Sequence, residues 1–505
     1  MADHDPARDP LYPDPRRQVS PQERDALIAA LDQVLPKDAL LHHGEDLRPY
    51  ECDGLSAYRR LPLAVILPHD LDQARAALGI CRERGIPVTA RGAGTGLSGG
   101  ALPFPDGVLL SLARFNRILE LDPNRRIARV QPGVRNLAIS EAATPHGLYY
   151  APDPSSQIAC SIGGNVAENS GGVHCLKYGL TVHNVLAVQM LTIDGELLTL
   201  GGEALDSPGY DLLALVHGSE GMLGIITEVT VRLLPKPERA QVLMAAFDDA
   251  QSAGEAVAGL IGAGIIPGGL EMMDNDAIRA AEDFVHAGYP VDAAAILLCE
   301  LDGTEAEVSE QVIQVRNLLL ESGATEVRTA RDEQERMRFW AGRKAAFPAV
   351  GRISPDYYCM DGTIPRRHLG KVLGGIAELS RAYGLRVANV FHAGDGNLHP
   401  LILFDANVSG ELEKAEELGG QILELCVEVG GTITGEHGVG IEKINQMCVQ
   451  FQPAELTQFH AVKAAFDPKG LLNPGKAVPT LHRCAEFGAM HVHRGQLPFP
   501  DLPRF

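Results

Sequence analysis

A glycine-rich loop followed at once by prolines is the feature that most limits how this 505-residue chain can fold. Residues 91–100 read Arg-Gly-Ala-Gly-Thr-Gly-Leu-Ser-Gly-Gly, and a G-x-G-x-x-G spacing begins at Gly94. That spacing is the dinucleotide fingerprint of a strand–loop–helix unit, which needs a helix directly after the loop. Pro103 and Pro105 prevent such a helix. A nicotinamide-type dinucleotide fold is therefore not expected.

The same loop remains well suited to hold an anion by its backbone. Successive glycines permit positive φ, so consecutive N–H groups can form a nest around a pyrophosphate, with Arg91 as a nearby countercharge. A flexible linker is the alternative, but linkers do not lie between two apolar strands, as residues 86–89 and 108–112 are expected to be. Two further glycine clusters occupy residues 161–172 and 218–224. An extended cofactor would explain all three clusters, although each alone could equally be tight-turn architecture.

The order of predicted elements indicates two units. A capping box at Ser20–Glu23 begins a helix that runs to about Leu35, and Asp70 caps a helix that ends at Arg84. Strands are expected at 63–67, 86–89, 108–112, 127–131, 185–193, 197–200 and 225–234, with a hairpin turn at Asp194-Gly195. Beyond Pro235-Lys-Pro237, strands at 241–247, 269–273, 293–301 and near Tyr357 and Val390 alternate with helices at 249–263, 305–321, 366–383 and 411–429. This second unit is predicted to be an α+β domain with an antiparallel sheet.

A pair of histidines flanks a strong reversal signal in the second unit. Asp395-Gly396 lies between apolar flanks in residues 389–399, Asn-Val-Phe-His-Ala-Gly-Asp-Gly-Asn-Leu-His, and predicts a hairpin. If residues 394–397 form the loop, His392 faces His399 with the Cβ atoms about 5 Å apart.

Two neutral imidazoles at that separation can share a divalent metal ion. Glu436, in the segment Gly435-Glu436-His437-Gly438, is the natural third ligand. Three protein ligands with an open position are typical of a catalytic site. His437 would then be free to act as a general base with a pKa near neutrality. The alternative, a surface or hydrogen-bonding histidine pair beside a turn, stays open on spacing alone.

Composition excludes several classes of partner and place. The net charge of −21 and a pI near 5.2 repel nucleic acid and anionic lipid, and an anionic substrate would need local cations. The nine cysteines show no close pairing, which argues against iron–sulfur ligands or a disulfide framework and fits a reducing compartment. The first residues lack a signal-peptide pattern, and no run of about eighteen apolar residues occurs. A cytoplasmic protein without a membrane span is expected.

Seven segments resemble the FAD-linked oxidases and dehydrogenases of the vanillyl-alcohol-oxidase type that act on 2-hydroxy acids. They are residues 91–103, 151–156, 161–172, 218–227, 392–399, 435–440 and 472–476, and the resemblance spans nearly the whole chain. It implies an α+β fold, in which a two-subdomain FAD-binding domain of the PCMH type precedes an α+β cap domain with a largely antiparallel sheet. The expected limits are an N-terminal helical segment at 1–50, the FAD-binding domain at 51–236, the substrate and cap domain at 237–478 and a docking tail at 479–505.

The resemblance also implies the residues that hold the cofactor. FAD is expected to bind noncovalently, because the chain has no matching site for a flavinylated residue. With Arg91 as countercharge, the pyrophosphate contacts carry over to Gly92, Gly94, Thr95, Gly96, Leu97 and Ser98. The segments that line the flavin correspond to Pro152, Asp153, Ser155, Gly163, Gly164, Asn165, Gly171 and Gly172. The segment near the adenine end corresponds to Ile226 and Thr227, and Asn473 is expected to contact the flavin ring.

The implied reaction is oxidation of glycolate to glyoxylate, with D-lactate as a further substrate. An ion held by His392, His399 and Glu436 (zinc, iron or manganese) would bind the substrate hydroxyl while the C2 hydride moves to flavin N5. His437 would take the hydroxyl proton, and Arg343 would bind the substrate carboxylate.

Three positions depart from relatives that hold a second carboxylate with polar or basic groups. Here those positions align with Phe347, Cys359 and Leu401, which favours a small monocarboxylate over D-2-hydroxyglutarate. The resemblance implies two partners, a second FAD-type subunit and an iron–sulfur subunit of a glycolate oxidase complex, which would place the chain peripherally at the inner face of the cytoplasmic membrane. The alternatives are a self-sufficient D-lactate or D-2-hydroxyglutarate dehydrogenase and a catalytically inert scaffold subunit; the complete His/Glu set argues against the scaffold.

Overall fold

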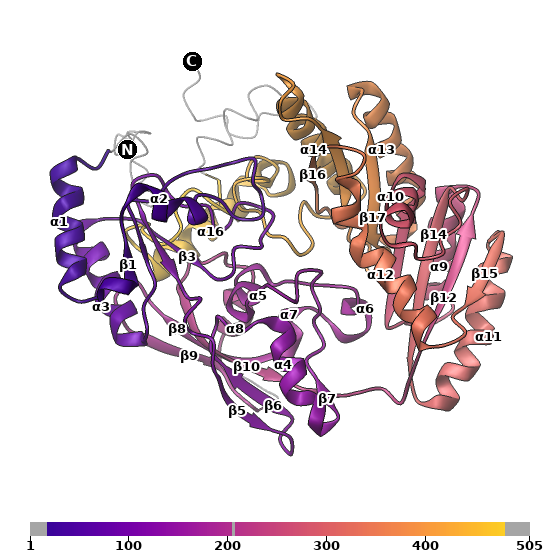
Figure 1. Cartoon of the computed structure of the whole chain (residues 1–505), viewed down its shortest axis with the longest axis horizontal. Helices are drawn as coiled ribbons and strands as arrows, with labels where there is room; N and C mark the ends of the chain where they lie inside the picture. The colour runs from indigo at the N-terminus through magenta and orange to yellow at the C-terminus, as the bar shows by residue number, and fades with distance from the viewer. Residues whose placement is uncertain (1–17, 205–207, 480–505) are drawn as a thin grey trace.

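The computed structural model describes residues 18–204 and 208–479, which form two halves side by side (Figure 1). One half contains a four-stranded, a five-stranded and a two-stranded sheet, and the other contains a large sheet with helices on both faces. The chain crosses from the first half to the second near Pro235, and its last described part returns to the first half. The predicted α+β fold class is confirmed.

The first sheet has the order β1-β2-β4-β3, and β4 pairs in parallel with both β2 and β3. Helix α3 begins after Asp70, whose side chain accepts the N–H of Gln73, and ends at Gly85 with φ 65°. Both ends follow the predicted capping signals. The elements of this part are α1 (Pro21–Asp32), β1 (Leu40–Leu41), α2 (Gly44–Leu47), β2 (Ala64–Ile66), α3 (Leu71–Arg84), β3 (Val88–Arg91) and β4 (Val108–Ser111).

The second sheet is antiparallel throughout, in the order β5-β6-β10-β8-β9. The predicted turn at Asp194-Gly195 joins β8 to β9, with Gly195 at φ 84°. The strands are β5 (Ile118–Asp122), β6 (Ile127–Val130), β8 (Val185–Leu191), β9 (Leu197–Gly201) and β10 (Ile225–Arg232), with β7 (Leu148–Tyr149) paired to β11 (Leu234–Pro235). The helices around it are α4 (Asn136–Ala143), α5 (Ile162–Glu168), α6 (Cys175–Tyr178), α7 (Thr181–Asn184) and α8 (Leu212–Val216).

The large sheet has seven strands in the order β15-β12-β14-β13-β17-β18-β16, and every neighbouring pair is antiparallel, as predicted. Its strands are β12 (Arg239–Phe247), β13 (Gly269–Asp274), β14 (Ala295–Gly303), β15 (Glu326–Thr329), β16 (Asp356–Cys359), β17 (Val387–His392) and β18 (Pro400–Phe404).

Helices cover both faces of this sheet because its central strands are apolar on both faces. In β12, Leu243 and Phe247 pack into one core and Met244 into the other, as the period of two requires. The first core is completed by α9 (Ala250–Gly262), α11 (Glu305–Glu321), α13 (Leu369–Tyr383) and α14 (Glu411–Glu428). The second is completed by α10 (Asn275–Val285) and α12 (Glu333–Val350).

The hairpin between β17 and β18 forms, but its predicted register is wrong by two residues. His392 is bridged to Asn397 rather than to His399, so the loop is 393–396. Gly396, at φ 83°, donates its N–H to the carbonyl of His392 and closes the turn one residue earlier. Since side chains alternate with period two, a shift of two keeps both histidines on one face. They lie on the side of α12.

The C-terminal segment runs from the second half into the first: Met447 packs in the core that contains α14, whereas Leu472 packs in the core of the first sheet. It includes α15 (Met447–Gln450) and α16 (Pro453–Phe466), and Leu472 forms a β-bridge with Val88. The buried ammonium of Lys463 contacts the Asp467 carboxylate at 2.6 Å and donates to the carbonyl oxygens of Met222 at 2.7 Å and Leu472 at 2.8 Å. The hydrogen bond from Lys463 to Met222 thus ties this segment to the FAD-binding half proposed from sequence.

The four domain limits expected from sequence stay predictions. The docking tail assigned to 479–505 lies outside the described residues except for Pro479, as do residues 1–17 of the N-terminal segment. In the described chain, no helix is both long and apolar enough to cross a membrane.

Replacing Lys463 with Met should lower the free energy of unfolding by about 3–5 kcal/mol, because Asp467 would stay buried without its cation. Thermal or denaturant unfolding of the purified protein measures this. Lys469→Met, at an exposed position close by, is the matched control and should change stability by less than about 0.5 kcal/mol. Equal effects of the two substitutions would contradict the assignment.

Candidate active site

A cavity of about 350 Å³ lies where the two halves meet. The glycine loop 91–97, helix α5 and residues 219–226 line it from the first half. From the second half, Lys344 and Phe347 of α12, together with His399, Glu436 and His437, line it. The glycine clusters and the histidine motif, which are far apart in sequence, therefore share one cavity.

Most residues assigned to FAD from the resemblance line this cavity. They are Arg91, Gly92, Gly94, Thr95, Gly96, Leu97, Ser155, Gly163, Gly164, Asn165 and Ile226. Arg91 lies under the loop: its Nη1 donates to the carbonyl of Cys52 at 2.6 Å, and a Cβ on Gly94 would collide with its guanidinium. Gly94 has φ 72°, so this close approach needs glycine for both reasons.

The other assigned residues lie behind the lining: Ser98, Pro152, Asp153, Gly171, Gly172, Thr227 and Asn473. Asn473 supports the loops, since its Nδ2 donates to the carbonyl oxygens of Gly100 at 2.9 Å and Glu220 at 2.6 Å. Gly171 abuts the second half, where a Cβ would lie 2.5 Å from Glu436 Oε2. Their predicted contacts with a cofactor stay predictions, and these hydrogen bonds suit a role in shaping the cavity.

His392 lies against two residues of the cavity wall, His399 and Glu436. Glu436 Oε1 lies 3.3 Å from His392 Nε2 and 3.0 Å from His399 Nε2. The side chains are 3%, 2% and 10% exposed, and one donor atom from each lies within 4.8 Å of the others. The second carboxylate oxygen, Oε2, is buried without a hydrogen-bond partner in the described structure. The three predicted ligands are thus brought together as a buried donor set.

Glu271 fixes the orientation of His392 and was missed from sequence. It pairs directly with His392 across β13 and β17, and its Oε1 contacts His392 Nδ1 at 2.7 Å. His392 Nε2 is thereby turned toward Glu436. Although burial opposes ionisation of Glu271, the His392 and Arg343 charges hold its pKa below the usual value. The sequence signal that could have identified Glu271 is its place as an acidic residue in the middle of the apolar strand predicted at 269–273.

Arg343 lies behind this pair and not on the cavity wall. Its Nε donates to Glu271 Oε2 at 2.8 Å, its Nη2 lies 2.6 Å from the same oxygen, and its side chain is 2% exposed. The cation that lines the cavity from the second half is the next residue, Lys344. Lys344 and Phe347 share a helix face, and the Phe347 ring lies 6.2 Å from that of His399. Binding of a substrate carboxylate by Arg343 stays a prediction.

Asp361, also missed from sequence, organises the segment that carries Glu436 and His437. Its Oδ2 accepts the hydroxyl of Thr434 at 2.6 Å and the N–H groups of Gly435 at 3.0 Å and His437 at 2.8 Å. Complete burial would raise its pKa, but the neighbouring His437, Lys443 and His399 lower it to about 2. A permanent carboxylate therefore holds this loop against the histidine hairpin.

His437 is buried against His399, and the two rings stack at 4.9 Å with planes 8° apart. Burial lowers the pKa of His437 to about 4, although Asp361 opposes this effect. The near-neutral pKa expected from sequence is therefore too high, because sequence did not show that the side chain would be only 13% exposed. At neutral pH the imidazole is uncharged and keeps a nitrogen able to accept a proton.

The fold and the cavity define a class of flavin-dependent enzyme, and comparison with known proteins identifies the family. A model of the FAD binding domain matches residues 62–201, and a model of the C-terminal domain of FAD linked oxidases matches residues 236–477. The crystal structure of p-cresol methylhydroxylase with substrate bound superposes with a TM-score of 0.79 at 18% identity, over 92% of this chain and 98% of that one. This confirms the predicted PCMH-type fold.

Two relatives are close in sequence. Glycolate oxidase subunit GlcD of Escherichia coli (strain K12) is 70% identical over 483 residues, which cover 96% of this chain and 97% of that protein. Glycolate oxidase subunit GlcD of Bacillus subtilis (strain 168) is 39% identical over 428 residues, which cover 85% and 91%. The chain belongs to the FAD-linked oxidases and is an FAD-dependent oxidoreductase.

Proposed function

We propose that this protein oxidises glycolate to glyoxylate with noncovalently bound FAD and one divalent metal ion. The observation that carries the proposal is the buried donor set of His392, His399 and Glu436, because His399 and Glu436 line the same cavity as the predicted FAD residues. The 70% identity to a glycolate oxidase subunit supports the choice of substrate.

The donor set fits a divalent ion. Two imidazole nitrogens and one carboxylate suit zinc, iron or manganese and leave positions open for substrate. Glu271 holds His392 in the tautomer with Nε2 available, and the unpartnered Oε2 of Glu436 offers a second ligand atom. A bound ion would lower the pKa of the substrate hydroxyl, and bound FAD would accept the hydride from C2.

His437 is proposed to take the proton of the substrate hydroxyl. It lines the cavity, its Nε2 lies 3.9 Å from Glu436 Oε1, and it is uncharged at neutral pH because burial lowers its pKa. Asp361 fixes the backbone on both sides of Glu436, so the distance between the proposed ligand Glu436 and the proposed base His437 is constrained. This arrangement suits general base catalysis beside a bound alcohol.

The cavity supports a small monocarboxylate. Phe347 lines it beside His399, while Cys359 and Leu401 are buried nearby, and none of the three carries a positive charge for a second carboxylate. Glycolate and D-lactate fit this environment better than D-2-hydroxyglutarate. For the first carboxylate, Lys344 is the cation that the second half places on the cavity wall, whereas Arg343 would have to leave Glu271 to reach it.

The electrons of reduced FAD are proposed to leave through partner subunits. The chain has no close cysteine spacing for a cluster, and its close relatives are described as subunits. A second FAD-type subunit and an iron–sulfur subunit, at the inner face of the cytoplasmic membrane, remain the proposed partners. A self-sufficient D-lactate or D-2-hydroxyglutarate dehydrogenase is the alternative, and rapid turnover of the isolated chain with a soluble carrier would favour it. The inert scaffold is not supported, because the buried donor set is complete.

Substituting His437 with Ala should leave FAD bound but slow its reduction by glycolate by about 10²–10⁴-fold, since proton removal is lost. Anaerobic stopped-flow absorbance measures the reduction with glycolate, D-lactate and D-2-hydroxyglutarate. His146→Ala, at an exposed position, is the control and should match the wild type. An unchanged rate in the His437 variant, or fastest reduction by D-2-hydroxyglutarate in the wild type, would refute the proposal.

Glu271→Gln should weaken binding of the divalent ion by about 10–100-fold, because His392 loses its charged hydrogen-bond partner. Chelator competition followed by elemental analysis measures the affinity. Glu300→Gln provides a control, since it also removes a buried carboxylate from the same sheet but contacts His174 and Trp340 instead. Equal ion affinities in both variants would show that Glu271 does not support the ligand.

Lys344→Met should raise the KM for glycolate about tenfold, because a charged hydrogen bond to the carboxylate is lost, while FAD and ion content stay unchanged. Lys371→Met on α13 is the exposed control.

In Arg343→Lys, the expected effect is loss of ion content through Glu271. A raised KM with full ion content in that variant, together with no effect of Lys344→Met, would instead establish Arg343 as the carboxylate ligand.

A further inference from the structure

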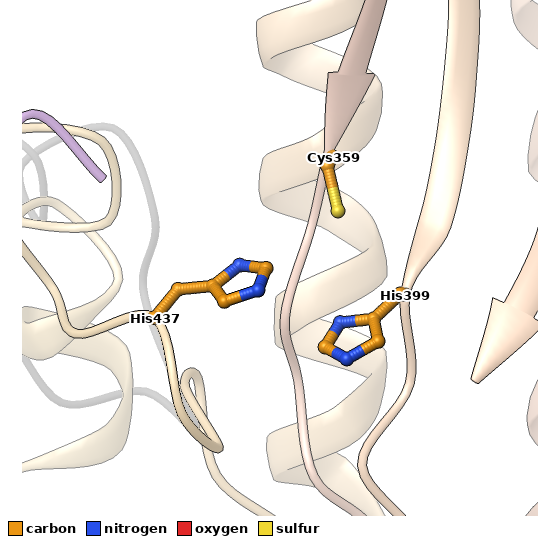
Figure 2. Close-up of side chains that lie close together, drawn as sticks. All are labelled: Cys359, His399 and His437. Carbon is orange, nitrogen blue, oxygen red and sulfur yellow. The ribbon is translucent and has the colours of Figure 1, made fainter. Parts of the chain in front are cut away.

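A second donor set lies beside the first and shares one residue with it. Cys359 is the last residue of β16, His399 immediately precedes β18, and His437 belongs to the loop that Asp361 holds. Figure 2 shows the Cys359 sulfur pointing toward the His399 ring. One donor atom from each lies within 4.8 Å of the others. Cys359 pairs in register with Leu401, so His399, two residues earlier, is on the same face of the sheet.

The histidine nitrogens on this side are unsatisfied. His399 uses Nε2 toward Glu436, and its Nδ1 is buried with no hydrogen-bond partner in the described part of the chain, the Asp361 carboxylate being 3.9 Å away. His437 Nδ1 is also buried without a partner among the described residues. A buried polar atom that lacks a partner destabilises the folded protein. A bound ion would satisfy both.

We propose that Cys359, His399 and His437 form a second site, selective for a thiophilic divalent ion such as zinc or cadmium, and that its occupation inhibits the enzyme. One sulfur and two imidazole nitrogens make a softer donor set than the two nitrogens and a carboxylate of the first site. Burial raises the pKa of the Cys359 thiol, so the empty site holds a protonated thiol. Binding would release that proton to solvent as the sulfur–metal bond forms.

The two sites exclude each other because a neutral imidazole offers only one lone pair. When Nδ1 of His399 binds the second ion, Nε2 carries the proton and can no longer hold the ion shared with His392 and Glu436. His437 would at the same time be a ligand and could not accept a proton. The proposed inhibition therefore rests on the proposed function of the first site and of His437. Binding of an ion to the second site does not depend on that function.

Titration of the FAD-loaded enzyme with cadmium tests the site. The thiolate-to-cadmium charge-transfer band in the ultraviolet difference spectrum should grow to one equivalent, and reduction of FAD by glycolate should stop in parallel. Cys359→Ser should lack the band and, relative to its own reduction rate without cadmium, should need at least tenfold more cadmium for inhibition. Cys299→Ser, which changes another free and buried thiol, should behave as the wild type.

Absence of the band in the wild type, or its persistence in Cys359→Ser, would overturn the proposal. Cys359→Ala serves as the second variant if the serine form does not fold, as judged by FAD content. His437→Ala should weaken cadmium binding at least tenfold, and unchanged affinity would remove His437 from the site. Because the band needs no turnover, it still reports on this site if glycolate proves not to be the substrate.

Discussion

The contact between Glu271 and His392 is the interaction on which the rest of the site depends. It is a direct cross-strand pair in the large sheet, so two rigid strands fix the imidazole before any ligand binds. Arg343 completes the pair from α12, so the carboxylate is neutralised on both sides within the core. A buried charge with two partners is costly to break, which makes this arrangement persistent.

From that fixed point the site extends toward the first half. His392 and His399 both meet Glu436, whose loop is held by Asp361 and whose Oε2 faces Gly171 in the first half. Only glycine fits at 171, because a Cβ there would touch the carboxylate. The donor set therefore meets the cavity at the boundary between the halves. The C-terminal segment, which Lys463 anchors, helps to hold the two halves together.

His399 connects the two proposed ion sites and shows how one residue can serve opposing roles. Its Nε2 belongs to a set with His392 and Glu436, and its Nδ1 is turned to the side of Cys359 and His437. The protonation pattern of a single ring would decide which set can bind. Cys359 belongs to both proposals, as one of the uncharged residues near the cavity in the first and as the sulfur ligand in the second.

The sequence by itself determined the elements and the list of candidate ligands. Local signals were sufficient for this: Asp70 and Gly85 at the ends of α3, Asp194-Gly195 in its hairpin, and the prolines after the glycine loop that rule out a following helix. The three metal-ligand candidates also came from short motifs, because histidines beside a turn and a glycine-flanked acid are readable without contacts.

Only the tertiary structure decided which partners those residues meet. The register of β17 and β18 depends on how Gly396 closes the turn, so pattern alone placed His392 opposite the wrong residue. Glu271 and Asp361 act across strands and loops distant in sequence, and nothing local distinguishes a buried supporting acid from an ordinary one. The direction of Arg343 and the low pKa of His437 likewise follow from burial, which depends on every element packed around them.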